Sequence, residues 1–391
     1  MEFDFATFKE KNNLLPQEIE GKEKYYRDLN NLEFSWTGRI DAQICNTFIQ
    51  ESNQLIVNAI TLFEKGYFDC AYYSLRQSLE VSTTMIYLVD SEAEIRSSEL
   101  KKWKSQDWFP MYSQMVKYLK NNGVVFSEIL DHMSDYFESI KNIKGDINKY
   151  VHKQGFKTFY VSRNHPVNEN NETNFVEEFE YYLEKCIGAV AVLRLSIDPF
   201  PLLLADEKIY HRTGDSMTKA YTDDFVEKYI GSENVENYKD TNFYQSHYDS
   251  IVNEEKKQPC VTQVVKDQYI DKEKIDDILK QKHLLPQEDL IAVLLTTISD
   301  QIAKIYCYGG LRVYFTNTNS KRESWSWSSQ DFKSFEQSDK DYNHVYDEAF
   351  ISCIKIYDEV YFIEHNEELD KAELAVLEKL RNKYEERELE K

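Results

Sequence analysis

The chain has 391 residues, of which 41% are apolar, so it is long enough for two globular domains and too apolar to be largely disordered. Its 69 acidic and 47 basic residues give a formal net charge of −22. An acidic field of this size opposes nonspecific binding to nucleic acids and to anionic membranes, so the composition does not favour a general polyanion-binding protein.

The chain is rich in aromatic residues and poor in helix breakers, with 28 Tyr and 22 Phe against 11 Gly and 7 Pro. This balance favours long helices over many short strands. The six cysteines are scattered without a CxxC pair, as is typical of thiols in a reducing compartment. Neither a signal peptide nor an apolar run of membrane-spanning length is visible, so we expect a cytoplasmic protein without membrane contact.

The first half of the chain predicts a bundle of helices. Apolar residues recur at helical spacing over 41–63 and again over 68–86, and Gly66 separates the two stretches. Because the link is short, we expect an antiparallel helical hairpin. A third helix is predicted to begin near Tyr112, and a fourth to cover 125–152.

An Asn-rich sequence at 160–174 predicts an exposed loop, and a fifth helix is expected to end at Ile197, where two prolines follow. We therefore predict a mainly α fold with an N-terminal segment at 1–36, a helical bundle at 37–205 and a second, mainly helical domain at 206–391. Within that second domain the sequence predicts helices at 216–230, 272–282, 286–306 and 366–391, a β-hairpin near 311–328 formed by strands at 311–316 and 324–328, and a further strand at 260–265.

Common catalytic and nucleotide-binding motifs are absent from the sequence. There is no GxxxxGK[ST], GxGxxG, HExxH or GxSxG, so nothing predicts an ATPase, a dinucleotide-binding domain, a zinc protease or a serine hydrolase, and we expect no cofactor. Trp325 and Trp327 alternate after two basic residues, a pattern that we interpret as core packing rather than base stacking. No compact spacing connects the scattered acidic and histidine side chains into a metal site, so none is expected.

Two short polar patterns on predicted helices are candidates for chemistry. The second helix carries LRQSLE, with Arg76 and Glu80 one turn apart. The fourth helix ends in NKYVH, with Asn148 and His152 one turn apart on one face. A histidine can exchange a proton with a substrate, and an arginine can stabilise a developing negative charge.

An apolar helical hairpin with LRxxLE, followed by a helix that ends in NxxxH, resembles the HEPN superfamily of helical domains over residues 40–205. Members of that family often cleave RNA without a metal, usually at a dimer interface, with an Arg placed shortly before the His. Here Asn148 and His152 match the Asn and His of the family motif, whereas Ile147 stands at the place of its Arg. Arg76 is the candidate for the missing cation. The alternative is purely structural, with an Arg76–Glu80 pair and a histidine that fixes helix packing.

Three functions stay open, two of them implied by the resemblance, and the residues do not decide whether the protein is an enzyme. The first is a non-catalytic or weakly catalytic HEPN-like protein that acts through dimerisation and through binding of a protein partner, RNA or a nucleotide, in bacterial stress or phage defence. The second is a toxin-like, metal-independent endoribonuclease that uses a rearranged site of Arg76, Glu80, Asn148 and His152. The third is a scaffold without a ligand site.

Overall fold

The structure, a computed structural model, describes residues 3–4, 17–91, 93–107, 109–159, 172–322, 328–338 and 340–385. The chain forms two compact units. The first comprises Met1–Tyr210 with Met217–Glu254, and the second comprises His211–Ser216 with Glu255–Lys391. The helical first unit therefore extends well past residue 205. Among the described residues no helix is both long enough and apolar enough to cross a bilayer.

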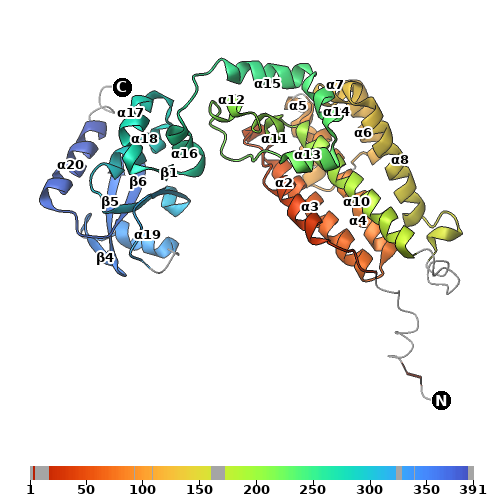
Figure 1. The fold of residues 1–391 in the computed structure, drawn as a ribbon, viewed down its shortest axis with the longest axis horizontal. Helices are drawn as coiled ribbons and strands as arrows, with labels where there is room; N and C mark the ends of the chain where they lie inside the picture. The colour runs from red at the N-terminus through yellow and green to blue at the C-terminus, as the bar shows by residue number, and fades with distance from the viewer. Residues whose placement is uncertain are drawn as a thin grey trace. The chain divides into compact units, whose positions relative to one another are not determined.

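The first unit consists of helices throughout its described part (Figure 1). They are α2 (Glu23–Glu33), α3 (Ile44–Glu64), α4 (Phe68–Val89), α5 (Ala93–Lys104), α6 (Tyr112–Asn122), α7 (Val125–His132), α8 (Ser134–Val151), α10 (Glu172–Leu195), α11 (Phe200–Leu203), α12 (Glu207–Tyr210), α13 (Asp223–Tyr229), α14 (Ser232–Lys239) and α15 (Asn242–Val252). The predicted hairpin is confirmed as α3 and α4. The predicted fourth helix is interrupted at Met133, which separates α7 from α8.

Helix α4 is the centre of the bundle. Of its 22 residues, 14 are buried, because it packs against α3, α6, α8 and α10. Small hydroxyl residues allow α3 to approach closely, and the hydroxyls of Ser52 and Ser82 lie 2.9 Å apart. Each of these hydroxyls also donates to a carbonyl of its own helix, so no buried donor is left unsatisfied there. A helix surrounded in this way holds its exposed residues in fixed positions.

The end of α10 is fastened by a fully buried ion pair. Arg194 Nη2 lies 3.1 Å from Asp198 Oδ1, and Arg194 Nε donates to the carbonyl oxygen of Ser35 at 2.6 Å. Asp198 also accepts from the Thr37 hydroxyl, so the chain before α3 and the turn after α10 are joined. The helix stops at Leu195, two residues before the predicted end, and Pro199 begins the next turn.

Residues 217–254 belong to the first unit, and α13 among them packs closely against α10. A Cβ added to Gly188 on α10 would lie 2.0 Å from the carbonyl oxygen of Tyr229 on α13. Only glycine permits this contact. Of the predicted helix at 216–230, only Asp223–Tyr229 is helical, with Thr222 as its N-cap.

The second unit is a mixed six-stranded sheet with helices on both faces (Figure 1). Its elements are α16 (Pro259–Asp267), β1 (Tyr269–Ile270), α17 (Ile275–Lys280), α18 (Gln287–Thr296), β2 (Ile302–Cys307), β3 (Arg312–Thr316), α19 (Ser329–Glu336), β4 (His344–Tyr346), β5 (Ala349–Ile356), β6 (Glu359–His365) and α20 (Lys371–Glu385). The strand order is β1-β3-β2-β6-β5-β4, in which β1 runs parallel to β3 and all other neighbours are antiparallel.

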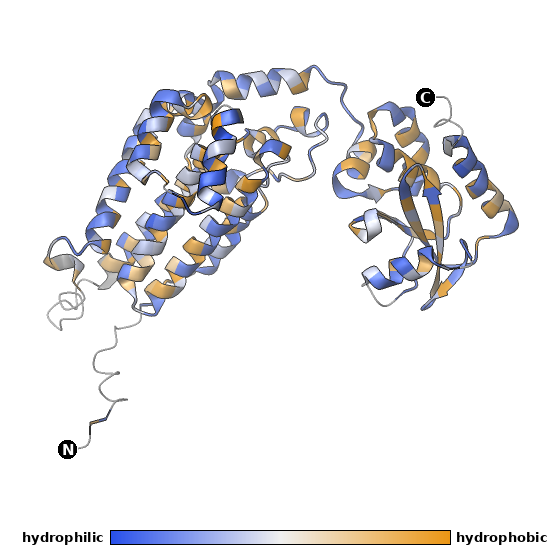
Figure 2. Ribbon diagram, turned by 180° about the vertical axis from the view of Figure 1, so that it is seen from behind, coloured by the Kyte–Doolittle hydropathy of each residue, from blue (hydrophilic) through white to orange (hydrophobic). Residues whose placement is uncertain are grey.

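Alternation along the strands divides the core of this unit into two layers. Ile305 on β2 belongs to the layer covered by α16, α17, α18 and α20, whereas its neighbour Tyr306 belongs to the layer covered by α19. Apolar residues are concentrated on the central strands, between helices that carry polar residues on their outer sides (Figure 2).

Two predictions for the second unit were wrong. The helix predicted over 286–306 is α18 followed by strand β2, because periodicity does not separate a buried helix from a buried strand within one apolar stretch. The strand predicted at 260–265 is part of α16, in which Pro259 occupies the first turn and Val261, Val264 and Val265 share the buried face.

The predicted hairpin near 311–328 is correct only for its first strand, which is β3. The antiparallel partner of β3 is β2, which precedes it in the chain, and most of the second predicted strand lies outside the described residues. The hairpin that the structure does contain is β5–β6. The predicted C-terminal helix begins later than expected, after Asp370, whose carboxylate accepts two backbone N–H groups of its first turn.

Candidate functional site

The structure brings all four candidate residues together between α4 and the end of α8. Arg76 Nη1 lies 3.3 Å from His152 Nε2, and Arg76 Nε lies 3.0 Å from Glu80 Oε1. Asn148 lies one turn before His152, and its backbone carbonyl accepts the His152 N–H at 2.9 Å. A guanidinium of α4 therefore lies beside the imidazole at the end of α8.

His152 is the C-cap of α8 and its side chain is exposed. An arginine side chain can only donate, so a hydrogen bond between the two groups uses Nε2 of His152 as the acceptor. An exposed imidazole beside a guanidinium is an arrangement that can bind a phosphate group and exchange a proton with a ligand.

Two contacts hold the end of α8 against α4. Lys153, in a left-handed conformation directly after the cap, forms an ion pair of 3.2 Å with Asp69 at the start of α4. One turn further along both helices, the rings of Tyr72 and Tyr150 stack at 4.3 Å, and the Tyr150 hydroxyl donates to Glu178 of α10 at 2.6 Å. These contacts fix the distance between Arg76 and His152.

Lys144 belongs to the same group of charges, although the sequence analysis did not select it. Its ammonium lies 3.2 Å from Glu80 Oε1 and 3.8 Å from the ring centroid of Tyr112. The residue is only 8% exposed, and burial lowers the pKa of its ammonium. The signal that could have found it is its position four residues before Asn148 and eight before His152, on the same face of the helix.

Glu80 therefore neutralises two cations at once. The set Arg76, Glu80, Lys144, Lys153 and Asp69 contains three cations and two carboxylates, so a single positive charge remains beside the His152 imidazole. A site of this kind suits a single anionic group better than a long polyanion.

Asn148 has one unsatisfied group. Its side-chain oxygen Oδ1 is buried and has no hydrogen-bond partner among the described residues. Buried acceptors are normally paired, so this oxygen lacks a hydrogen bond that most buried acceptors have.

The described part of the chain assembles none of the other candidates into a site. Trp325 and Trp327 lie outside the described residues. Within the described ranges no three His, Cys, Asp or Glu side chains are arranged to hold a metal ion. In the second unit Ser352 Oγ lies 2.9 Å from His365 Nε2, but both residues are fully buried, so no substrate reaches them.

Comparison of the chain with protein-family models, with curated proteins and with solved structures finds no match.

Proposed function

We propose that the first unit binds a phosphate group of RNA or of a nucleotide between Arg76 and His152, as a HEPN-like protein with little or no catalytic activity. The observation that supports this function is the 3.3 Å contact between a guanidinium and an exposed imidazole. Both groups offer N–H donors to an anion once the ligand replaces their mutual contact, and an arginine matches the geometry of phosphate oxygens.

The surroundings of Arg76 favour binding over rapid cleavage. Its Nε and Nη2 both lie 3.0 Å from Glu80, so part of its charge is already neutralised in the free protein. Cleavage of RNA needs a base for the 2′-hydroxyl and an acid for the leaving oxygen, and one chain places a single imidazole here. A second copy of the chain would supply the other, which makes a homodimer part of the proposal.

Fluorescence anisotropy with a short labelled single-stranded RNA at low salt tests the binding. We expect Arg76→Ala to weaken the affinity about tenfold and to lower the salt slope by about one, because one phosphate contact is lost. Lys239→Ala removes an exposed lysine of the same unit, which is paired only with Glu236, and serves as the matched control. Equal affinities of the two variants would contradict the proposal and leave a scaffold without a ligand site.

Metal-independent cleavage of RNA is the second candidate function. The observation in its favour is that an exposed imidazole, the group that most often acts as a general base, lies 3.3 Å from a guanidinium that can stabilise a charged phosphorane. The test is incubation of RNA with the purified protein in excess EDTA. Cleavage that disappears in both His152→Ala and Arg76→Ala, and persists in Lys239→Ala, would replace the binding-only function with this one.

A further inference from the structure

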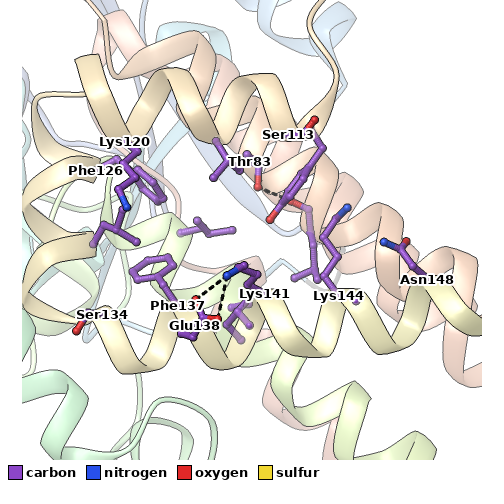
Figure 3. A pocket seen from close by; sticks show the side chains of 18 of the residues that line it. Thr83, Ser113, Lys120, Phe126, Ser134, Phe137, Glu138, Lys141, Lys144 and Asn148 are labelled. Atoms are coloured by element: carbon purple, nitrogen blue, oxygen red, sulfur yellow. Dashed lines mark hydrogen bonds and ion pairs between the residues drawn. The ribbon is translucent and has the colours of Figure 1, made fainter.

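Two cavities of the first unit differ in the charge of their walls. The larger one, of about 610 Å³, is lined by α4, α6, α7, α8 and α10, and three lysines belong to its lining (Figure 3). The smaller one, the aromatic pocket, has a volume of about 470 Å³ and is lined by α3, α4, the end of α5, residues 109–111 and the start of α6. Glu51 and Glu80 line the aromatic pocket, and none of the described residues that line it is Lys, Arg or His. Its charge therefore favours a cation.

Four aromatic rings form much of the wall of the aromatic pocket, those of Phe48, Trp103, Phe109 and Tyr112. The face of an aromatic ring attracts cations, and that of tryptophan attracts them most strongly. Tyr112 already attracts one, because the Lys144 ammonium lies 3.8 Å from its ring centroid. Within the described part of the chain no cation lies over the other three rings, so they are left for a ligand.

The two carboxylates keep some of their capacity for a cation. Glu51 is exposed and forms no ion pair with any described residue. The contacts of Glu80 with Arg76 and Lys144 are made through Oε1, and Oε2 accepts no hydrogen bond within the described part of the chain. The net charge of −22 adds to the attraction for cations.

The rings and a carboxylate lie close enough together for one small ligand. The Phe48 ring contacts the Trp103 ring, with centroids 5.0 Å apart, and Glu51 follows Phe48 by three residues on the same face of α3. Trp103 is 38% exposed, so its ring is accessible. On α4 the lining runs from Gln77 to Thr84, which at about 1.5 Å per residue makes the pocket about 10 Å long.

The rest of the wall suits an ammonium group without N–H donors. The Thr84 hydroxyl already donates to the carbonyl oxygen of Glu80 at 2.8 Å, and the other side chains of the wall are largely apolar, among them Val81, Pro110, Met111 and Met115. A primary ammonium that leaves water needs several acceptors for its N–H groups. A quaternary ammonium carries methyl groups in their place, and aromatic walls are the surroundings in which proteins bind it.

We propose that the aromatic pocket binds an organic molecule with a quaternary ammonium group. The methyl groups lie against the face of Trp103, and the carboxylate of Glu51 lies within range of the positive charge. This binding does not depend on whether RNA binds between Arg76 and His152.

Calorimetric titration of the full chain with choline and with 3,3-dimethylbutan-1-ol tests the assignment. The two probes have the same shape, and the second has a carbon atom in place of the charged nitrogen. We expect the wild-type protein to bind choline about tenfold more tightly, because only choline gains from the ring faces and the carboxylates. Ethanolamine, the primary ammonium analogue, should bind more weakly than choline.

Substitutions of Trp103 separate the ring from its bulk. Trp103→Leu should lower the ratio of the two affinities to about threefold or less, whereas Trp103→Phe keeps a ring and should keep most of the preference. Continued binding of the neutral alcohol by Trp103→Leu shows that the pocket is still folded.

Substitution of Glu51 tests the carboxylate. Glu51→Gln should weaken choline about threefold at low salt and leave the neutral alcohol unchanged. Glu236→Gln changes the net charge by the same amount, at a side chain of α14 that is 70% exposed and outside the pocket, and should behave as wild type.

Trimethylated lysine side chains of proteins carry the same group as small quaternary ammonium compounds, and a trimethyl-lysine amide distinguishes the two sources. Binding of this amide about tenfold more tightly than choline supports a methylated peptide as the ligand, and weaker binding supports a small molecule. Equal affinity of the wild-type protein for choline and the alcohol, no binding of choline at millimolar concentration, or an unchanged ratio in Trp103→Leu would overturn the proposal.

Discussion

At the scale of the residue, the buried Arg194–Asp198 ion pair predicts a large loss of stability when one of its partners is removed. Both side chains are almost fully buried, and Asp198 additionally accepts from Thr37 and from the backbone N–H of Phe200. We expect Asp198→Ala to lower the free energy of unfolding by about 3–5 kcal/mol, because an unpaired guanidinium is left in the core. Urea denaturation measures this change.

Glu236→Ala is the control for that experiment. It breaks a surface pair with Lys239 in which the carboxylate side chain is 70% exposed, so the loss should stay below about 1 kcal/mol. Similar losses in the two variants would show that Arg194 gains solvent or another partner when Asp198 is removed.

The buried imidazole of His365 should make the free energy of unfolding depend on pH. Its Nδ1 donates to the carbonyl oxygen of Glu367 at 2.7 Å and its Nε2 accepts from Ser352, so the buried ring is neutral. Burial lowers the pKa of this imidazole from its ordinary value of 6.5. Below that pH the unfolded chain takes up a proton that the folded chain does not, so this residue makes stability fall with decreasing pH.

The measurement is the unfolding free energy of wild type and of His365→Gln at pH 7.5 and at pH 5. Carboxylates common to both proteins cancel in the difference. We expect the advantage of the wild type to be smaller at pH 5, by at most about 1.4 kcal/mol for each pH unit below 6.5. An advantage that stays constant or grows would mean that the folded protein protonates this ring as readily as the unfolded chain.

At the scale of the elements, Glu80 joins α4 to α8 through its two cationic partners, Arg76 and Lys144. Glu80→Gln removes the carboxylate and leaves the side chain in place. We expect the affinity for a short RNA to rise about fivefold, since Arg76 no longer has to leave an ion pair of about 1 kcal/mol to bind phosphate.

Glu138→Gln changes the net charge of α8 by the same amount, at an exposed pair with Lys141. Its effect on RNA affinity should stay below about twofold in physiological salt, where exposed charges are screened. An equal gain in both variants would assign the effect to net charge and remove Glu80 from the site.

The elements that the sequence predicted correctly are those whose apolar residues recur at one clear helical spacing. The stripes of α3 and α4 are regular, and Gly66, with a φ of 82°, marks the break between them. The sheet was missed because β2 follows α18 within one apolar stretch, and because β2 pairs with β6, almost 60 residues later, through contacts that no local pattern encodes.

The candidate site was predictable only in part, for a related reason. Arg76, Asn148 and His152 stand in recognisable patterns, and their proximity follows from two helices packed side by side. For Lys144 the only signal is its spacing from Asn148 and His152, and its burial could not be predicted, because lysine is normally exposed and the positions of Glu80 and Tyr112 explain its burial here. The cavity of about 610 Å³ lined by α4, α6, α7, α8 and α10 likewise arises from five helices, and no one of them predicts it.

At the scale of the whole molecule, the chain enters the second unit twice, because residues 211–216 belong to it while 217–254 belong to the first. That short segment is held within the second unit: the Lys257 N–H donates to the carbonyl oxygen of His211 at 2.8 Å, and the His211 ring lies 3.0 Å from the Thr262 hydroxyl.

A single peptide-bond cleavage between Glu254 and Glu255, where the chain is exposed, should consequently leave two fragments that migrate together on a sizing column. The upstream fragment still contributes residues 211–216 to the fold of the downstream one, as a noncovalent insert. Denaturant should separate the two polypeptides. Separation in native buffer would contradict the expectation, because residues 211–216 would then not hold the fragments together. A second unit produced from residues 255–391 alone therefore lacks residues 211–216, which have to be added back to complete its fold.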